Sequence, residues 1–354
     1  MSNENDNIIL NELDPQILIF ISKYLKVNLD TNIFSNTSEI FNIQVQAHKY
    51  KVINCVFNLQ KSNNIPNVNT FFSGVNKILK KDSFYVGCVE TIELRRIRIK
   101  KKYSPLKRYF FNYFDFIFRR LLPKIKFFKS IYSFLSKEKN QVFSKAEILG
   151  RLVYSGFKII DYKIINLENP LLFFIVTKHK DPIVSNPTNY GPIFKMQRVG
   201  KHGKMIGVYK IRTMHPYSEY LQSYVLKKYG NSVDGKIKND FRLTEYSKTI
   251  RKFWIDEIPQ IINVLKGDMN IFGPRPVSLV RFKQFPVELQ NLRIRYKPGC
   301  IPAYLSFNYD SDSNSLIKSE FQYLNLRRKY GIIIHAYLIL VAFYNIIFKS
   351  RRSS

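Results

Sequence analysis

Residues 240–276 contain the feature that most constrains the fold, a short apolar stripe with charged and turn-forming residues at its ends. The stripe has the spacing i, i+3, i+4 and i+7, which is typical of one face of an amphipathic helix. Its members are Ile258, Ile261, Ile262 and Leu265. Pro259 suits the first turn of a helix, and Gly267 suits the left-handed residue after its end. The pattern therefore predicts a short helix over residues 258–266.

Two adjacent carboxylates, Asp256 and Glu257, directly precede the predicted helix. Unpaired backbone N–H groups and the positive end of the helix dipole favour anions at this position. A carboxylate held there is expected to stay ionised, as a nucleophile or a metal ligand must be. The alternative is that Asp256 is only an N-cap and Glu257 only a first-turn acid. Taken alone, the pair favours this structural alternative.

The chain has 354 residues and a formal net charge of +31. The length allows two domains, and the charge predicts an anionic partner, which is a nucleic acid, a membrane surface or a phosphorylated substrate. Three widely spaced cysteines argue against a disulfide framework and indicate a reducing, cytosol-facing environment. The first ten residues lack the basic flank and apolar core of a signal peptide. The five histidines show no spacing typical of zinc ligands.

The first part of the chain alternates predicted strands and helices. Strands are expected at 51–59 and 83–91, with an amphipathic helix at 69–81 between them. A helix capped by Ser144 and two strands within 158–179 continue the pattern, which predicts an α/β fold. This order resembles the C-terminal half of a class I methyltransferase, where a final helix leads into a β-hairpin. Because no glycine-rich turn for a nucleotide or adenosyl cofactor is present, the resemblance implies a truncated, non-catalytic scaffold.

Residues 95–139 form a basic aromatic segment between those elements. They hold fifteen lysine and arginine residues against two acids, interleaved with phenylalanine and tyrosine. This combination is typical of an interfacial helix that places cations at anionic headgroups and rings at the acyl boundary. Arg119, Arg120 and Pro123 interrupt the apolar run too often for a membrane span. A nucleic-acid patch and a solvated basic face around core aromatics are the alternatives.

Proline and glycine residues cluster within 182–192 and indicate a linker. We place a domain boundary there, with a truncated α/β domain at 1–182 and a second, α+β domain at 183–354. The latter begins with a predicted β-hairpin over 195–214 that turns at Gly200 to Gly203.

Lys210 and Arg212 lie two residues apart on the second strand of that hairpin, so they are expected on one face. There they suit a diphosphate, the arginine with its bidentate fork and the lysine as a point charge. A solvated hairpin is the structural alternative for this segment.

The longest apolar run, residues 332–348, is followed by basic residues. It is short for a membrane span and contains His335 and Asn345. We expect an interfacial or partly inserted helix, with a core helix as the alternative and a full span as a third.

Three segments together resemble the bacterial sugar transferases that are monotopic phosphoglycosyl transferases. They are QRVGKHGK with YKIRTM, then DFRLTEYSKTIRK, then IDEIPQIINVLKGDMNIFGPRPVS, and they cover about 190–300. The resemblance implies membrane-associated enzymes that transfer a sugar-1-phosphate from a UDP-sugar to polyprenol (undecaprenyl) phosphate with Mg²⁺. It also implies the cytoplasmic face of the inner membrane, an anionic membrane surface as partner, and a first step of polysaccharide biosynthesis such as that of a capsule, exopolysaccharide or O-antigen.

Residue by residue, the resemblance implies that Asp256 is the nucleophile, which would form a covalent intermediate and release UMP. Glu257 would hold Mg²⁺ or orient the acceptor. The turn formed by Pro274, Arg275 and Pro276 would meet the nucleotide or its phosphate. Further cations would neutralise charge during phosphoryl transfer. These are Arg198, Lys210, Arg212 and Arg242, for each of which a surface ion pair is the alternative.

Two departures from the family pattern bear on the acceptor site. The apolar re-entrant helix that usually precedes the QxRxG segment is replaced by the polar stretch HKDPIVSNPTNYGP, and the Pro-Gly-Ile-Thr-Gly stretch by KPGCIPAYL. Two other classes of function stay open, a catalytically inactive membrane scaffold and a basic nucleic-acid-binding protein. The intact carboxylate pair argues against the first, and the Asp-Glu-Pro-Gln helix has no role in the second. We therefore expect an enzyme that does not bind nucleic acid.

Overall fold

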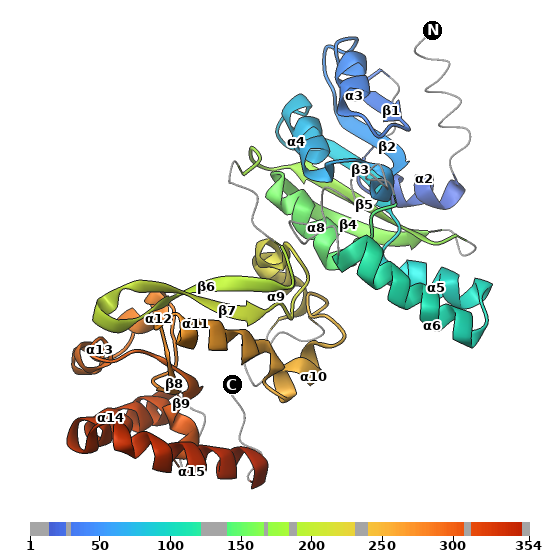
Figure 1. Ribbon diagram of the computed structural model, residues 1–354. Coiled ribbons are helices and arrows are strands. Elements are labelled where there is room, and N and C mark those ends of the chain that lie inside the picture. The colour runs from blue at the N-terminus through green and yellow to red at the C-terminus, as the bar shows by residue number, and fades with distance from the viewer. Residues whose placement is uncertain are drawn as a thin grey trace. The chain divides into compact units, whose positions relative to one another are not determined.

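Figure 1 shows the computed structural model, which describes residues 14–25, 30–121, 140–165, 169–183, 190–230, 240–307 and 313–348. The chain forms two compact units. The first comprises Met1–Tyr190 and Met214–Thr244, and the second comprises Gly191–Thr213 and Glu245–Ser354. Both mix helices with sheet, so the predicted α/β class is confirmed.

The first unit is built on a five-stranded sheet in the order β1-β2-β3-β5-β4. Its strands are β1 (Asn32–Ser35), β2 (Cys55–Lys61), β3 (Phe84–Val89), β4 (Phe157–Ile165) and β5 (Leu171–Lys178). β1, β2 and β3 run parallel, whereas β5 is antiparallel to both β3 and β4. The predicted strands and the predicted hairpin are confirmed. The sequence does not predict β1, because four residues are too few to show a period.

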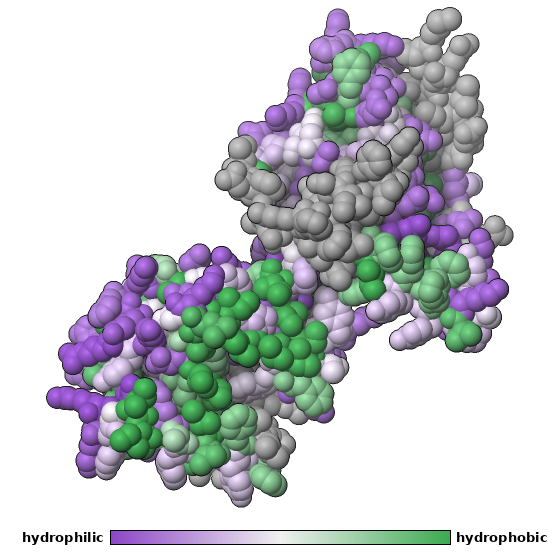
Figure 2. Space-filling view, in the orientation of Figure 1, coloured by the Kyte–Doolittle hydropathy of each residue, from purple (hydrophilic) through white to green (hydrophobic). Residues whose placement is uncertain are grey.

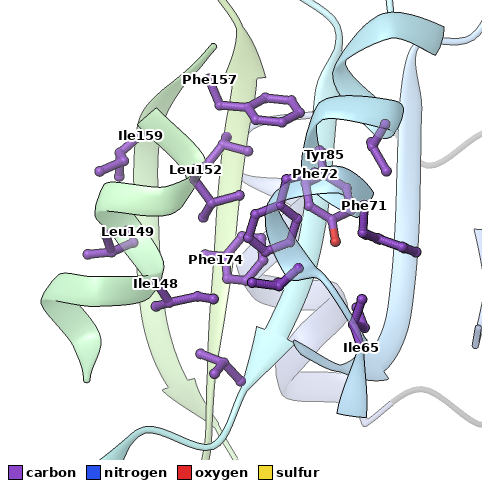
Figure 3. Packing of buried hydrophobic residues seen from close by; sticks show 14 of the residues in the cluster. Ile65, Phe71, Phe72, Tyr85, Ile148, Leu149, Leu152, Phe157, Ile159 and Phe174 are labelled. Atoms are coloured by element: carbon purple, nitrogen blue, oxygen red, sulfur yellow. The ribbon is translucent and has the colours of Figure 1, made fainter. Parts of the chain in front are cut away.

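Helices cover both faces of this sheet (Figure 1). On one face lie α3 (Ile40–Ala47), α4 (Val68–Ile78) and α8 (Lys145–Tyr154), and on the other lies α2 (Pro15–Ser22). Phe72, Tyr85 and Phe174 meet at the centre of the first core, with ring centroids 5.6 to 6.2 Å apart (Figure 3). Alternate strand residues serve the two cores, as the two-residue period of a strand requires.

The segment Met214–Thr244 belongs to the first unit, so the division of the chain differs from the single boundary predicted near residue 183. It contains η5 (Ser218–Leu221) and α9 (Gln222–Tyr229). Leu221 and Val225 are fully buried in the same core as α8. This burial of apolar side chains is the physical reason for the difference, and a break in composition at the linker does not reveal it.

Helices α5 (Ile92–Lys102), α6 (Pro105–Phe114) and the π-helical η2 (Asp115–Leu121) form the described part of the basic aromatic segment. The rest of that segment, 122–139, lies outside the described residues, as do 184–189 of the predicted linker. A short 3-10 turn, η1 (Ser62–Asn64), follows β2.

The second unit begins with the predicted hairpin, formed by β6 (Ile193–Val199) and β7 (Met205–Ile211) around the turn η4 (Lys201–Gly203). A second, parallel pair joins β8 (Asn270–Gly273) to β9 (Gly299–Pro302). Between and after them come α10 (Ser247–Lys252), η6 (Ile255–Gln260), α11 (Ile261–Leu265), α12 (Leu279–Lys283), α13 (Val287–Arg293) and η7 (Ala303–Ser306).

The chain ends in two helices, α14 (Ser313–Tyr330) and α15 (Ile334–Phe348), joined by η8 (Gly331–Ile333). Leu338 and Ala342 of α15 are buried in a core with Phe272, whereas Leu340 and Tyr344 are exposed. This helix is therefore partly a core helix, with an apolar side that lies at the surface. Within the described residues, no helix has the length and apolar character needed to cross a membrane.

Gly150 of α8 provides a test of the packing between α8 and the segment 214–244. A Cβ atom there would lie 2.3 Å from the Tyr217 carbonyl oxygen. At Gly74 of α4, a Cβ atom would instead meet the Ile40 side chain, which can move. Both alanine variants gain about 1 kcal/mol of helix propensity. We expect Gly150→Ala to lower the unfolding free energy by about 2 kcal/mol, and Gly74→Ala to lower it less, in urea titrations. An equal or smaller loss for Gly150→Ala would contradict this packing.

Candidate active site

Asp256 and Glu257 lie inside the 3-10 helix η6, which precedes the α-helical turn α11. The N-cap of η6 is Trp254, which has a left-handed backbone, and it makes no side-chain capping bond. The predicted helix is therefore confirmed, with Gly267 in the left-handed conformation after its end, but it begins at Ile255. The reading of Asp256 as an N-cap is wrong, because the helix begins three residues before its predicted start at Ile258 and its N-cap is Trp254.

The apolar stripe of this helix faces outward, contrary to the usual reading of an amphipathic pattern. Ile258 is 55% exposed and Leu265 is 83% exposed, and the two isoleucines between them are also exposed. Figure 2 shows an extended hydrophobic area on the part of the second unit that carries α11 in Figure 1. The carboxylates therefore sit on an element whose other side offers an apolar surface.

Lys210 of β7 is the cation that faces the carboxylate pair. Its Nζ donates to Glu257 Oε1 at 2.7 Å and lies 4.0 Å from Asp256 Oδ2. Each of the two carboxylate side chains is 14% exposed. The structure thus brings together three of the predicted site residues, and the reduced exposure makes their attraction stronger than it would be in open water.

The buried Asn263 of α11 fixes the strand that carries Lys210. Its side-chain amide donates to the Gly207 carbonyl at 2.8 Å, and its side-chain oxygen accepts from the Tyr209 N–H at 3.0 Å. On the edge of β7 that faces the helix, these two hydrogen bonds take the place of hydrogen bonds to a neighbouring strand. Sequence reasoning missed this role, since an asparagine inside a helix gives no signal of a partner 54 residues away.

Burial raises the pKa of Asp256 above its usual 3.8. The charge of Lys210 lowers that pKa, and the charge of Glu257 raises it again. The expectation that Asp256 stays ionised remains a prediction, and burial is the largest of the effects that act on its pKa. Lys210 thus acts against the effect of burial on this pKa.

Hydrogen bonds to its backbone carbonyls hold the turn of Pro274, Arg275 and Pro276 in place. The Pro274 carbonyl accepts from the Gly299 N–H at 3.0 Å, and the Arg275 carbonyl accepts from the Arg293 guanidinium at 2.5 Å. The Arg275 side chain donates a hydrogen bond to the Tyr304 hydroxyl at 3.0 Å. The turn is thereby fixed with its arginine beside a phenol.

Arg293 is buried, and it also donates to the carboxylate of Glu320 on α14. It therefore connects the core of the second unit to the backbone of Arg275. The sequence does not reveal this role of Arg293, because its partners lie 18 and 27 residues away.

Arg198 of β6 lies close enough to Arg275 for the two charges to interact. Burial lowers the pKa of the Arg198 guanidinium, and the charge of Arg275 lowers it further. Two guanidinium groups held near each other repel unless an anion lies between them. Arg198 pairs across the hairpin with Ile206, four residues before Lys210, which is about 13 Å along a strand. The second unit thus carries one cation at the carboxylates and two further cations, Arg198 and Arg275, whose charges interact.

Two predicted site residues, Arg212 and Arg242, make contacts with groups other than the carboxylate pair. Arg212 donates to the Gly191 carbonyl at 3.2 Å and lies over the Phe194 ring, at the open end of the hairpin. Arg242 belongs to the first unit, where its buried guanidinium donates to Asp240 at 2.7 and 2.8 Å. Each arginine thus has a structural role in its own unit, and a place for either of them in the cationic cradle stays a prediction.

The carboxylate pair matches the way proteins usually hold Mg²⁺. That ion commonly takes one or two carboxylates and completes its shell with substrate phosphates and water. Within the residues that the structure describes, no group of three histidine, cysteine or acidic side chains is placed to hold a metal. The donors at hand are the oxygens of Asp256 and Glu257, which fit a metal shared with a phosphorylated substrate.

A family model described as bacterial sugar transferase matches residues 170–349, half of the chain. A galactosyl transferase, CpsE, from Streptococcus agalactiae is 36% identical over 38% of this chain and 31% of that protein. An undecaprenyl-phosphate galactose phosphotransferase from Salmonella typhimurium is 38% identical over 32% of this chain and 24% of that protein. A UDP-glucose:undecaprenyl-phosphate glucose-1-phosphate transferase from Klebsiella pneumoniae is 32% identical over 46% of this chain and 32% of that protein. The chain thus spans a third or less of the length of these relatives.

A solved SAM-dependent methyltransferase from Methanosarcina mazei aligns with 48% of this chain and 99% of its own, with 12% identity and a TM-score of 0.25. A score this low carries no conclusion about the fold. The resemblance of the first unit to a truncated methyltransferase therefore rests on its order of strands and helices alone.

Asn263 offers a test of how the site is held. Replacing it with alanine leaves the Tyr209 N–H and the Gly207 carbonyl without their partners. We expect Asn263→Ala to lower the unfolding free energy by about 2 to 4 kcal/mol in urea titrations. The control is Asn291→Ala, at an exposed asparagine of α13, for which we expect a change within about 0.5 kcal/mol. Equal effects of the two variants would contradict the role of Asn263.

Proposed function

The chain belongs to the bacterial sugar transferase family, and we propose from this premise that it transfers a sugar-1-phosphate from a UDP-sugar to polyprenol phosphate. The observation that supports the proposal most directly is the carboxylate pair held 2.7 to 4.0 Å from Lys210. Two relatives are named as transferases that act on undecaprenyl phosphate, which is the same class of reaction.

Asp256 is the proposed nucleophile. One of its carboxylate oxygens attacks the phosphorus that bears the sugar, the bond from that phosphorus to the oxygen bridging to UMP breaks, and UMP leaves with the electron pair. A phosphate oxygen of the polyprenol phosphate then attacks the same phosphorus. The acyl phosphate bond breaks, Asp256 regains its carboxylate, and the product is a polyprenyl diphosphate sugar.

The cations of the second unit have separate parts in this scheme. Lys210 lowers the pKa of Asp256 against the effect of burial, and its charge also opposes the build-up of negative charge on the transferred phosphoryl group. Arg198 and Arg275 suit the nucleotide side of the donor, because their mutual repulsion favours a bound anion. Tyr304 orients the Arg275 side chain through its hydroxyl.

We also propose Mg²⁺ as a cofactor, held by Glu257 together with phosphate oxygens of the donor. When bound, the ion would neutralise charge on the diphosphate and make UMP a better leaving group. Glu257 would then divide its oxygens between the metal and Lys210, which is 2.7 Å away. Asp256, farther from the lysine, remains available to react.

The exposed stripe on η6 and α11 supports a membrane surface as the place of reaction. Polyprenol phosphate carries its phosphate on a long apolar chain, so an acceptor site needs apolar surface close to the nucleophile. Ile258 and Ile261 provide this surface on the same short helical segment as Asp256. We therefore propose a protein associated with the cytoplasmic face of the membrane, where UDP-sugars are available.

Replacing the proposed nucleophile should separate chemistry from folding. With membranes, Mg²⁺, polyprenol phosphate and a panel of UDP-sugars, we expect Asp256→Asn to reduce UMP release by about a thousandfold or more and to leave the unfolding curve intact. The matched control, Glu288→Gln on the exposed surface of α13, should keep full activity. Turnover of Asp256→Asn at the normal rate would exclude this aspartate as the nucleophile.

The pH dependence of kcat/KM tests the link between Lys210 and Asp256. Because Asp256 must be ionised to react and its pKa is raised, activity should fall on acidification at a pH above that of an ordinary aspartate. Lys210→Met removes the charge that lowers this pKa, so the acid limb should move to higher pH. Lys204→Met, at an exposed lysine of the same hairpin, should leave the limb in place. A limb at the same pH in all three proteins would contradict the proposed coupling.

A further inference from the structure

Helix α6 of the first unit presents an apolar face to the surface. Leu106, Tyr109, Phe110 and Tyr113 follow the spacing i, i+3, i+4 and i+7 and are 60% to 84% exposed. No residue of α6 is buried. The rings of Tyr103 and Phe111 stack at 4.4 Å on the side toward α5, so the exposed stripe is the side of α6 that its neighbour leaves uncovered.

The same elements carry a strong positive charge. Residues 92–121 hold ten lysine and arginine residues against two acids. Lys100, Lys101 and Lys102 form the last turn of α5, and Lys107 is exposed in the first turn of α6. Figure 2 shows hydrophobic and hydrophilic surface side by side over the part of the first unit that carries α5 and α6 in Figure 1. The apolar stripe is therefore bordered by cations.

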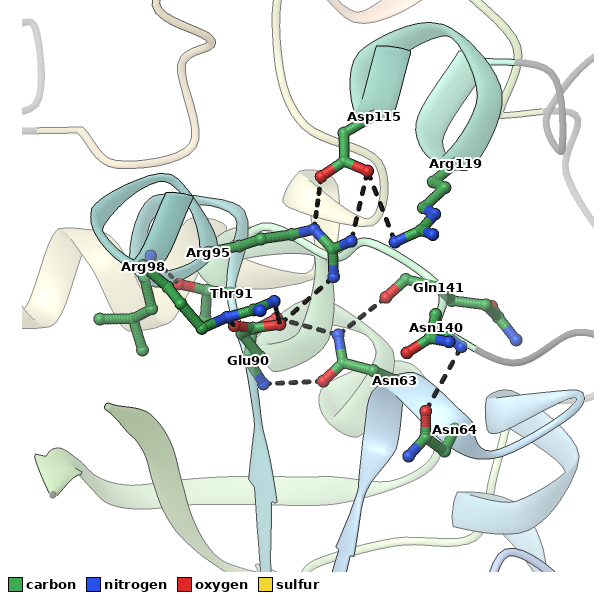
Figure 4. A network of polar contacts seen from close by, with 11 residues as sticks. Asn63, Asn64, Glu90, Thr91, Arg95, Arg98, Asp115, Arg119, Asn140 and Gln141 are labelled. Carbon is green, nitrogen blue, oxygen red and sulfur yellow. Dashed lines mark hydrogen bonds and ion pairs between the residues drawn. The ribbon is translucent and has the colours of Figure 1, made fainter. Parts of the chain in front are cut away.

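A buried network of charges fixes these helices to the sheet (Figure 4). Arg95 of α5 donates to both oxygens of Asp115, at the start of η2, and to Glu90 at 3.3 Å, directly after β3. Arg98 adds a bidentate contact to Glu90, at 2.5 and 3.0 Å. The arginine that joins the two carboxylates is only 8% exposed. α6 thus lies between two elements that are both tied to the end of β3.

The network continues into the sheet through Asn63 of η1. The Asn63 side chain accepts from the Glu90 N–H at 2.7 Å and donates to the carbonyls of Glu90 and Gln141 at 2.9 and 2.8 Å. The backbone of Glu90 is therefore fixed as firmly as its side chain. These contacts hold α5 and η2 in place. The exposed rings of α6 therefore lie on a helix whose two neighbours are fixed.

We propose that the outward face of α6 docks on an anionic lipid surface, with its rings at the acyl boundary and the lysines of α5 and α6 at the headgroups. Aromatic and aliphatic residues on one face, flanked by cations, suit the interface between headgroups and acyl chains. The aliphatic Leu106 and the unbroken stripe favour lipid over a nucleic acid, which takes rings by stacking on splayed bases. This docking is independent of the sugar transfer proposed for the second unit.

The depth of residue 110 in the bilayer tests the proposal in the full chain. Trp254 is the one tryptophan of the sequence, so Trp254→Phe gives a background without indole fluorescence. In that background Phe110→Trp places a reporter on the exposed stripe, and Phe41→Trp places a matched one on α3, at a phenylalanine that is equally exposed. Vesicles of phosphatidylglycerol with phosphatidylcholine, brominated on the acyl chains, serve as the probe. We expect the indole of Phe110→Trp to be quenched and that of Phe41→Trp to remain bright.

Charge variants test the headgroup contacts in the Phe110→Trp background. Neutralising Lys100 and Lys107 to glutamine should raise the lipid concentration for half-maximal quenching about fivefold per lysine. The pair Lys80→Gln and Lys81→Gln, at exposed lysines before β3, should have a smaller effect. An indole that stays bright on vesicles to which the protein sediments would overturn the proposal. So would a response to double-stranded DNA with none to vesicles.

Discussion

The ion cluster of Lys210 with Asp256 and Glu257 is the interaction on which the candidate site depends. Two neighbouring carboxylates of low exposure repel each other and lose hydration, so they require a cation within a few ångströms. The hairpin supplies that cation from 46 residues earlier in the chain, and Asn263 sets the position of its second strand. The signature sequence around the carboxylates therefore includes both the proposed reacting groups and the residue that positions their counter-charge.

The sequence predicts local elements of this protein well. The strands within 51–59 and 83–91, the hairpin that turns at Gly200 and the helix after the carboxylates all have short periods and clear end signals, and the structure confirms them. Membership in the sugar transferase family also follows from a long motif with fixed spacing. What these predictions share is that the responsible residues lie close together in the chain.

The predictions that differ from the structure concern burial, which depends on partners far away in sequence. The stripe that includes Ile258 and Leu265 has the period of a core-facing helix, but the period indicates an apolar face without showing what covers it. The segment Met214–Thr244 follows the hairpin in the chain and still packs in the first unit, through Leu221 and Val225. Burial also raises the pKa of Asp256, an effect that its position in the sequence does not reveal.

The contacts of each arginine indicate whether it has a structural role or a proposed role at the candidate site. The sequence alone does not provide this distinction. Arg95, Arg242 and Arg293 are buried against carboxylates, and removing either partner would leave a charge without compensation. Arg198 instead lies in the field of another arginine, Arg275, whose backbone is fixed by Arg293 and whose side chain is directed by Tyr304. A fold that fixes two like charges close together raises its own free energy. A bound anion would remove that repulsion, and this is the physical basis on which we propose that the two arginines bind the diphosphate of a nucleotide sugar.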